Sequence, residues 1–149
     1  GQLIFINVEL KNYSSPMDDL PQKVVSLVKQ YNLEASVLFS SFNPLALIRA
    51  RRLIPDVPLG LLTISGSSGA LLRSRLGRLI PHQALHPAYS DVTKTLIQNT
   101  QRSGRRINVY NVNEKEEIVR LFTLGVDGIF TDDPVLAQQV LTEIKSIKS

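Results

Sequence analysis

The sequence predicts an α/β protein of about six β/α units with parallel strands, which we interpret as an incomplete (β/α)8 TIM barrel. Three observations support this class. Strand-like and helix-like apolar patterns alternate along the whole chain. The connections between them are short, so consecutive strands require crossover helices and run parallel. The first strand, finally, has two chemically different faces. No linker or low-complexity tract divides the chain, and residues 1–149 are therefore interpreted as a single domain.

The elements follow one another in a regular order. Strands are expected at Leu3–Lys11, Ser36–Ser41, Leu59–Thr63, Ala84–His86, Arg106–Val112 and Asp127–Thr131. Helices are expected at Leu20–Tyr31, Pro44–Ile54, Leu71–Leu79, Ser90–Ser103, Glu114–Leu124 and Pro134–Lys148. Pro44 suits the first turn of its helix. Gly104 and Gly125 suit the C-terminal ends of the helices that they follow.

The first strand favours a barrel over an open, doubly wound sheet. Its even-numbered positions are all aliphatic, from Ile4 to Leu10, whereas its odd-numbered positions turn polar from Phe5 to Glu9 and Lys11. A central strand of an open sheet is covered by helices on both faces and is apolar on both. A barrel strand instead points one face into the interior, which becomes the active site at the C-terminal rim.

Composition narrows the function classes. The chain is 43% hydrophobic and 20% charged, as in globular proteins, and it has no cysteine for a disulfide framework. No apolar run approaches the roughly 18 residues of a membrane span. The net charge of +4 includes two arginine clusters, at residues 49–52 and 73–78, which alternate with aliphatic residues as on solvated helix faces. Aromatic residues are not interleaved with them, so nucleic-acid binding is not expected. The compartment stays open, with a slight preference for the cytoplasm.

Glu9 and Lys11 are the first candidate site residues. They share the inward face of the first strand, with side chains about 7 Å apart. A carboxylate and an ammonium at a barrel mouth can hold a hard metal ion and an anionic oxygen. A structural salt bridge is the alternative, which spacing alone leaves open. Further polar residues are expected at the same rim because they end the other strands: Ser41, Phe42, Thr63, His86, Asn111, Asn113, Thr131 and Asp132.

The two histidines and a Gly/Ser-rich stretch are weaker candidates for ligand binding. His86 ends a strand and can reach a ligand, although a structural histidine fits equally, and His82 is expected to be exposed. The stretch Ser65–Gly69 follows a strand and precedes a helix, where backbone N–H groups can cradle a phosphate. It lacks the spacing of a known nucleotide-binding loop, so a surface loop is preferred.

Four segments together resemble the glycerophosphodiester phosphodiesterase family, in its order and spacing and over nearly the whole chain. They are "FINVELK" at Phe5–Lys11, "SSFNPLALIRARRLIPDVPLGLL" at Ser40–Leu62, "INVYNVN" at Ile107–Asn113 and "GVDGIFTDDP" at Gly125–Pro134. The resemblance implies a TIM barrel that hydrolyses glycerophosphodiesters to glycerol 3-phosphate and an alcohol, using a divalent metal, Mg²⁺ or Ca²⁺.

The same resemblance implies roles for single residues. Glu9 corresponds to a metal ligand and Lys11 to the catalytic lysine that approaches the phosphate. Phe42 and Tyr110 correspond to substrate-pocket positions, and we add His86 as a third substrate-binding residue. Tyr110 stands where the family usually has tryptophan, and Asn111 where it has threonine, so the alcohol group preferred is not predicted.

Other parts of the family pattern are absent: a His-Arg-Gly strand, a Glu-x-Asp strand and a His-Asp loop. We therefore expect this chain to supply only part of an active site, to be inactive alone, and to self-associate or pair with a missing N-terminal segment. The alternatives are a non-catalytic binding module derived from the barrel and a doubly wound nucleotide-binding domain.

Overall fold

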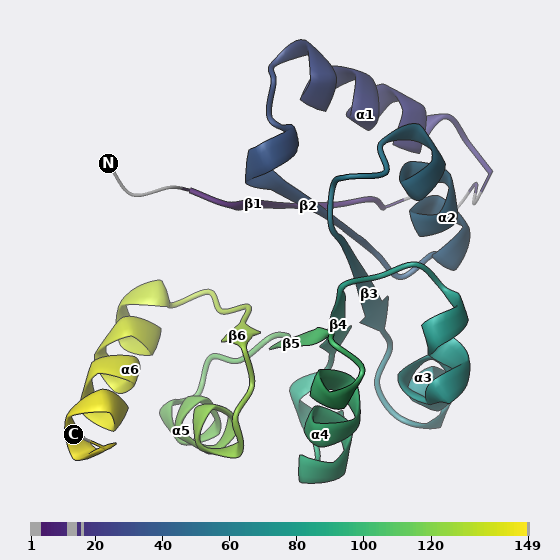
Figure 1. The fold of residues 1–149 in the computed structure, drawn as a ribbon. Coiled ribbons are helices and arrows are strands. Elements are labelled where there is room, and N and C mark those ends of the chain that lie inside the picture. The colour runs from purple at the N-terminus through teal and green to yellow at the C-terminus, as the bar shows by residue number, and fades with distance from the viewer. Residues whose placement is uncertain (1–3, 12–14, 16, 149) are drawn as a thin grey trace.

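A computed structural model describes residues 4–11, 15 and 17–148 of the chain (Figure 1). The strands are β1 (Ile6–Glu9), β2 (Val37–Ser41), β3 (Leu59–Thr63), β4 (Ala84–Pro87), β5 (Arg106–Val109) and β6 (Gly128–Ile129). The α-helices are α1 (Leu20–Gln30), α2 (Pro44–Leu53), α3 (Ser67–Arg73), α4 (Lys94–Arg102), α5 (Lys115–Leu124) and α6 (Pro134–Lys148). Short 3-10 turns are η1 (Glu34–Ser36), η2 (Arg75–Leu79) and η3 (Tyr89–Asp91).

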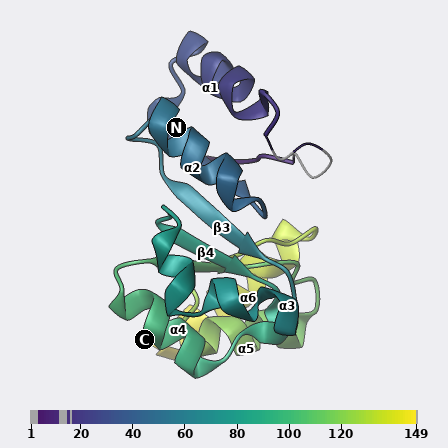
Figure 2. The same ribbon diagram turned by 90° about the vertical axis from the view of Figure 1, so that its right-hand side faces the viewer.

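The six strands form one parallel sheet in the order β1-β2-β3-β4-β5-β6. The sheet curls, with the helices on its outer side: α1 and α2 lie beside its first strands and α4 to α6 beside its last (Figures 1 and 2). The fold is thus a half-barrel of β/α units, as predicted. Because each strand neighbours the next one in sequence, the sheet has no switch point, and the doubly wound alternative is wrong.

The pairing register defines an inner and an outer face, because residues paired across parallel strands point to the same side. Asn7 and Glu9 of β1 pair with Leu38 and Ser40 of β2. Following the pairs across the sheet gives the remaining inward positions: Gly60, Leu62, Ala84, His86, Arg106, Asn108 and Gly128. The inner face is therefore polar or small at many positions, which leaves room for a lumen.

The outer face carries the hydrophobic core. One cluster joins β1 to β4 with α1 and α2 around Phe39 and Leu61, which are fully buried. A second cluster joins β5 with α4, α5 and α6 around Ile107 and Leu121. The aliphatic side of the first strand partly follows this scheme: Leu10 is 1% exposed, whereas Ile4 is 77% exposed.

Several predicted boundaries differ from the structure. The helix expected at Leu71–Leu79 is two pieces, because Ser74 adopts an extended conformation and its Oγ caps the new turn by accepting from Leu76 N. The preceding helix α3 starts earlier than expected, at Ser67, inside the Gly/Ser stretch. The last strand is only Gly128–Ile129, and the strand expected to reach Val112 ends at Val109. Among the described residues, no helix is both long and apolar enough to cross a bilayer.

Candidate active site

Glu9 and Lys11 lie together at the C-terminal end of β1. The distance from Lys11 Nζ to Glu9 Oε2 is 3.7 Å, so the two side chains share one side of the sheet, as the alternation predicts. The Lys11 side chain is 65% exposed and that of Glu9 is 28% exposed. An ion pair with an exposed lysine is worth at most about 1 kcal/mol, so stability alone gives little reason for it.

Glu9 faces an open cavity of about 550 Å³ at the mouth of the half-barrel. Its wall is made by residues from both ends of the sheet, and its polar members are Asn7, Glu9, Asn111, Thr131 and Asp132. The apolar members are Leu62, Ile129, Phe130 and Pro134. The curl thus brings β1 and the segment after β6 to one site, although they are far apart in the sequence. This convergence was predicted for Asn111, Thr131 and Asp132.

An aromatic pair connects the ends of β2 and β5. The Phe42 and Tyr110 rings meet edge to face, with centroids 5.7 Å apart. Tyr110 donates its hydroxyl hydrogen to the carbonyl oxygen of Thr63 at 2.8 Å. Partial burial, reinforced by the negative charge of Asp91, raises the pKa of the Tyr110 phenol. Tyr110 is therefore a neutral donor that fixes the position of an aromatic wall.

An ion pair missed by sequence reasoning supports this rim. Arg73 Nη1 lies 3.1 Å from Asp91 Oδ2, and both side chains are largely buried. Asp91 also accepts hydrogen bonds from the backbone N–H of Gly66 at 3.1 and 3.2 Å. Because a carboxylate already occupies this N–H, the structure gives no support to a phosphate cradle in the Gly/Ser stretch.

His86 lies inside the barrel, below the mouth. It is fully buried and lines a lumen cavity of about 650 Å³, which adjoins the mouth cavity at Asn7, Ile129 and Phe130. Asn108 Nδ2 donates to His86 Nε2 at 3.2 Å, while Nδ1 has no hydrogen-bond partner within the described part of the chain. Burial, with a smaller effect of His82, lowers the pKa of His86 to about 4. His86 is therefore a neutral lumen residue, and its contact with substrate stays a prediction.

Three expectations about polar residues are corrected. His82 is 7% exposed rather than solvent-facing, and its Nδ1 hydrogen-bonds with the carbonyl oxygen of Ile80 at 2.8 Å. Ser41 and Thr63 are fully buried on the outer face, not at the mouth, since their strand partners face the helices. Ser41 Oγ donates to Leu10 O at 2.7 Å and accepts from the backbone N–H at position 43, tying β1 to the start of α2.

The donor set at the mouth does not by itself form a metal site. Within residues 4–11, 15 and 17–148, no group of three or more histidine, aspartate or glutamate residues is placed to hold a cation. Asp132, the other carboxylate of the mouth, accepts a hydrogen bond from Asn113 Nδ2 at 2.7 Å. Divalent cations such as Ca²⁺ take six or more oxygen ligands. Further ligands would have to come from outside these residues.

The fold and site define a class of protein: a parallel β/α barrel with a polar site at the carboxyl ends of its strands. A family model of the glycerophosphoryl diester phosphodiesterase family matches residues 4–136. The chain belongs to this family. It is 30% identical over 129 residues to a glycerophosphodiester phosphodiesterase of Caldanaerobacter subterraneus subsp. tengcongensis, which covers 87% of this chain and 52% of the relative. It is 32% identical to one of Bacillus altitudinis, over 94% of this chain and 57% of that protein.

Solved structures agree with this membership. A structure from Silicibacter pomeroyi that carries the name of the family matches with a TM-score of 0.84 and 29% identity, over 95% of this chain and 51% of that one. A phosphodiesterase of Oleispira antarctica, solved with its product sn-glycerol 3-phosphate, matches with a TM-score of 0.77 and 25% identity, over 93% and 55%. The chain thus spans just over half the length of these four proteins.

Proposed function

We propose that this chain takes part in the hydrolysis of glycerophosphodiesters to glycerol 3-phosphate and an alcohol, as one part of an active site. Membership of the family supports the reaction class. The observation that carries the proposal for this chain is the pair Glu9 and Lys11, of which Glu9 lines the mouth cavity. The product bound to the Oleispira antarctica relative supports a substrate that contains a glycerol phosphate.

Each site residue has a distinct proposed role. Lys11 offsets the negative charge that develops on the phosphoryl oxygens. Glu9 is one ligand of a divalent cation, Mg²⁺ or Ca²⁺, whose other ligands come from outside this chain; such an ion polarises phosphoryl oxygens. Phe42 and Tyr110 form an apolar wall for the substrate, and His86 contacts it from the lumen. Glu9 and Asp132 are the carboxylates that line the mouth, and the described residues provide no group of three metal ligands, so we propose that the chain alone does not hydrolyse the substrate.

We also propose that the open flank of the half-barrel is covered in solution, by self-association or by pairing with other polypeptide. In the described residues β1 pairs only with β2, and β6 only with β5, so each leaves an unpaired edge. Phe5 and Ile6, beside the first edge, are 57% and 42% exposed. Unpaired edges with exposed apolar side chains promote association. Light scattering after size exclusion tests this, and a monodisperse monomer across all concentrations contradicts it.

A chimeric barrel tests the catalytic proposal. Residues 1–149 are fused to the part of the Caldanaerobacter relative that the match does not cover, which we expect to be N-terminal, and release of glycerol 3-phosphate from glycerophosphocholine is measured with Mg²⁺ or Ca²⁺. We expect activity in the chimera and none in the chain alone. Glu9→Gln is expected to lower kcat/KM of the chimera by about 100-fold or more. The control is Glu143→Gln, which breaks the exposed pair Lys115–Glu143 (3.1 Å) on the helical layer and is expected to change nothing.

A non-catalytic binding module is the second candidate, favoured by the lack of a complete metal-ligand group among the described residues. The same chimera distinguishes the partial phosphodiesterase site from the binding module. Binding of glycerol 3-phosphate that depends on Lys11 but not on added metal, with no hydrolysis, supports the module. Robust hydrolysis by the chain alone contradicts our assignment of a partial active site.

A further inference from the structure

The 3-10 turn η2 presents three chemically distinct edges. In a 3-10 helix, side chains three residues apart lie one above the other. Leu76 and Leu79 therefore share one edge, and Arg75 and Arg78 share the next. The third edge faces the protein, because Gly77 is buried and a Cβ on it would overlap the Leu72 carbonyl group. We call the four exposed residues, Leu76, Leu79, Arg75 and Arg78, the η2 face.

The leucines of the η2 face are unusually exposed for their type. Leu79 is 83% exposed and Leu76 is 58% exposed, and Leu71 on the neighbouring α3 is 61% exposed. Fully burying a leucine side chain is worth about 1.5–3 kcal/mol, and these exposed leucines forgo most of that free energy. The face therefore offers apolar area that nothing in the described chain covers.

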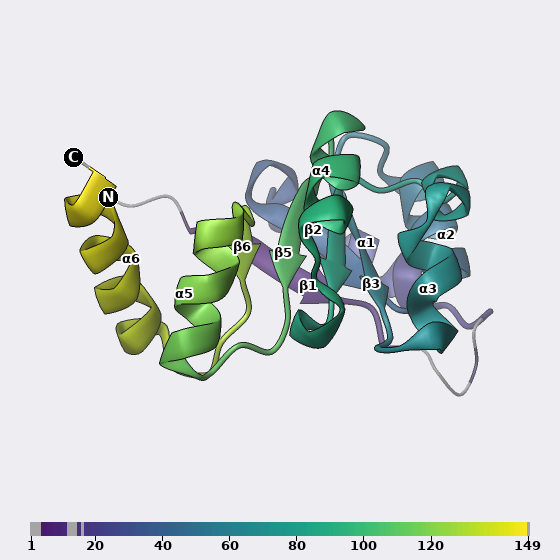
Figure 3. The same cartoon turned by 90° about the horizontal axis from the view of Figure 1, so that it is seen from below.

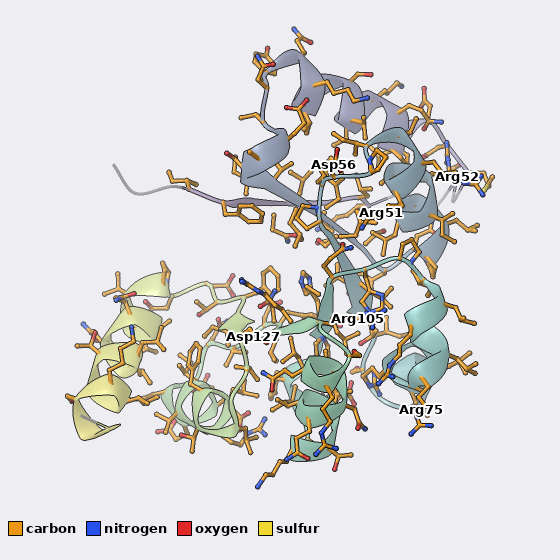
Figure 4. The ribbon with its side chains drawn as sticks, in the orientation of Figure 1. Arg51, Arg52, Asp56, Arg75, Arg105 and Asp127 are labelled. Atoms are coloured by element: carbon orange, nitrogen blue, oxygen red, sulfur yellow. The ribbon has the colours of Figure 1, made fainter. Side chains whose placement is uncertain are left out.

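The segment that contains the η2 face carries no negative charge of its own. No aspartate or glutamate occurs between Asp56 and Asp91, a stretch that contains Arg73, Arg75 and Arg78. The charge of Arg73 is already paired with that of Asp91. In the part of the chain that the structure describes, Arg75 and Arg78 form no salt bridge, and the hydrogen bond given by Arg78 goes to a backbone carbonyl of α4 at 3.0 Å. Figure 4 shows Arg75 at the outer edge of the molecule, beside α3.

The position of this face separates it from the open flank. η2 follows α3 in the connection between β3 and β4, the middle strands of the six-stranded sheet, and it lies against α4, since Arg78 donates to an α4 carbonyl. Figure 3 shows α3 near α2 and α4, with α6 at the opposite end of the row of helices. Polypeptide that extends the sheet beyond β1 or β6 would therefore not cover Leu76 and Leu79.

We propose that the η2 face docks the protein on a bilayer that contains anionic phospholipid. Leu76 and Leu79 enter the boundary between headgroups and acyl chains, and Arg75 and Arg78 pair with lipid phosphates. Adjacent leucine and arginine edges are the pattern of interfacial helices, and each basic residue near an anionic surface adds attraction. The two arginines would suit a protein partner as well, but leucine is under-represented in protein hot spots and the η2 face has no Trp or Tyr, so a protein partner fits less well.

Co-sedimentation with vesicles tests the proposal. The chain is mixed with vesicles of phosphatidylcholine alone or of phosphatidylcholine with phosphatidylglycerol, at low and high salt. We expect binding to the phosphatidylglycerol vesicles that weakens with salt. Arg75→Gln with Arg78→Gln is expected to weaken partitioning roughly 25-fold, at about fivefold for each arginine. Leu76→Ser with Leu79→Ser is expected to weaken it by about tenfold or more.

Matched controls keep the test independent of folding and of the open flank. Leu27→Ser changes a leucine that is 53% exposed on α1, and Arg52→Gln changes an exposed arginine on α2; neither is expected to alter binding. Thermal melts by circular dichroism establish that every variant is folded. Three outcomes overturn the proposal: equal binding to both vesicle types, equal loss in the control variants, or capture by a polyglutamate peptide through the η2 face without vesicle binding.

Discussion

Gly60 is the position where one methyl group tests the packing of the lumen most sharply. It lies on the inner face of β3, and a Cβ there would overlap the His86 ring, 2.8 Å from Nε2 and 3.0 Å from Nδ1. The ring borders the lumen cavity, but its hydrogen bond to Asn108 and its edge-to-face contact with Phe130, with centroids 5.0 Å apart, hold it in place. Such overpacking costs about 1–3 kcal/mol. Gly60→Ala is therefore expected to lower the free energy of unfolding by this amount.

A double-mutant cycle with His86→Ala isolates the cause. Urea unfolding is followed at one fixed protein concentration, since any association makes stability concentration-dependent. In the His86→Ala background the added methyl group has free space, and the reduced freedom of the unfolded chain makes Gly60→Ala neutral or stabilising by up to about 1 kcal/mol. The two effects of Gly60→Ala are thus expected to differ by about 1 kcal/mol or more. Equal effects in both backgrounds would show that His86 does not fill the space beside Gly60.

Three further predictions concern buried polar groups. Ser41→Ala removes a buried hydroxyl with two hydrogen bonds and is expected to cost about 1–3 kcal/mol in urea unfolding, whereas Ser40→Ala, whose buried hydroxyl has no partner in the described chain, is expected to be neutral or slightly stabilising. The pKa of His86, about 4 when folded, lies below the 6.5 of an exposed histidine, so the unfolded chain binds more protons in acid. Stability is therefore expected to fall by on the order of 2 kcal/mol between pH 6.5 and 4.5, and less in His86→Gln; an unchanged urea midpoint would contradict this. Tyr110→Phe keeps the ring against Phe42 but loses one hydrogen bond, so it is expected to cost about 1 kcal/mol of stability with little change in KM of the chimera.

The sequence was sufficient for the order of the elements, because apolar periodicity is a local property. The alternation in the first strand also predicted that Glu9 and Lys11 share a face, and the structure confirms it. The same alternation carried across the sheet would have identified Asn108 as a lumen residue, since it lies two positions before Tyr110.

Other features depend on contacts that no local pattern contains. His82 was expected to be exposed because it stands in a connection, but η2 and Arg105 cover it, and Arg105 Nε donates to its carbonyl oxygen at 3.2 Å. Ser41 and Thr63 were placed at the mouth because they end strands, yet whether a strand end faces inward depends on register. The pair Arg73–Asp91 joins segments that the fold alone brings together.

The central claim is that Glu9 and Lys11 act on one phosphate at the barrel mouth. A double-mutant cycle in the chimera tests it most directly, with kcat/KM measured for Glu9→Gln, Lys11→Met and the double variant. Each single change is expected to lower kcat/KM by about 10²–10³-fold, and the double variant to be little worse than the poorer single one. Losses that multiply independently, or single variants as active as Lys115→Met on the helical layer, would contradict a shared role for the two residues.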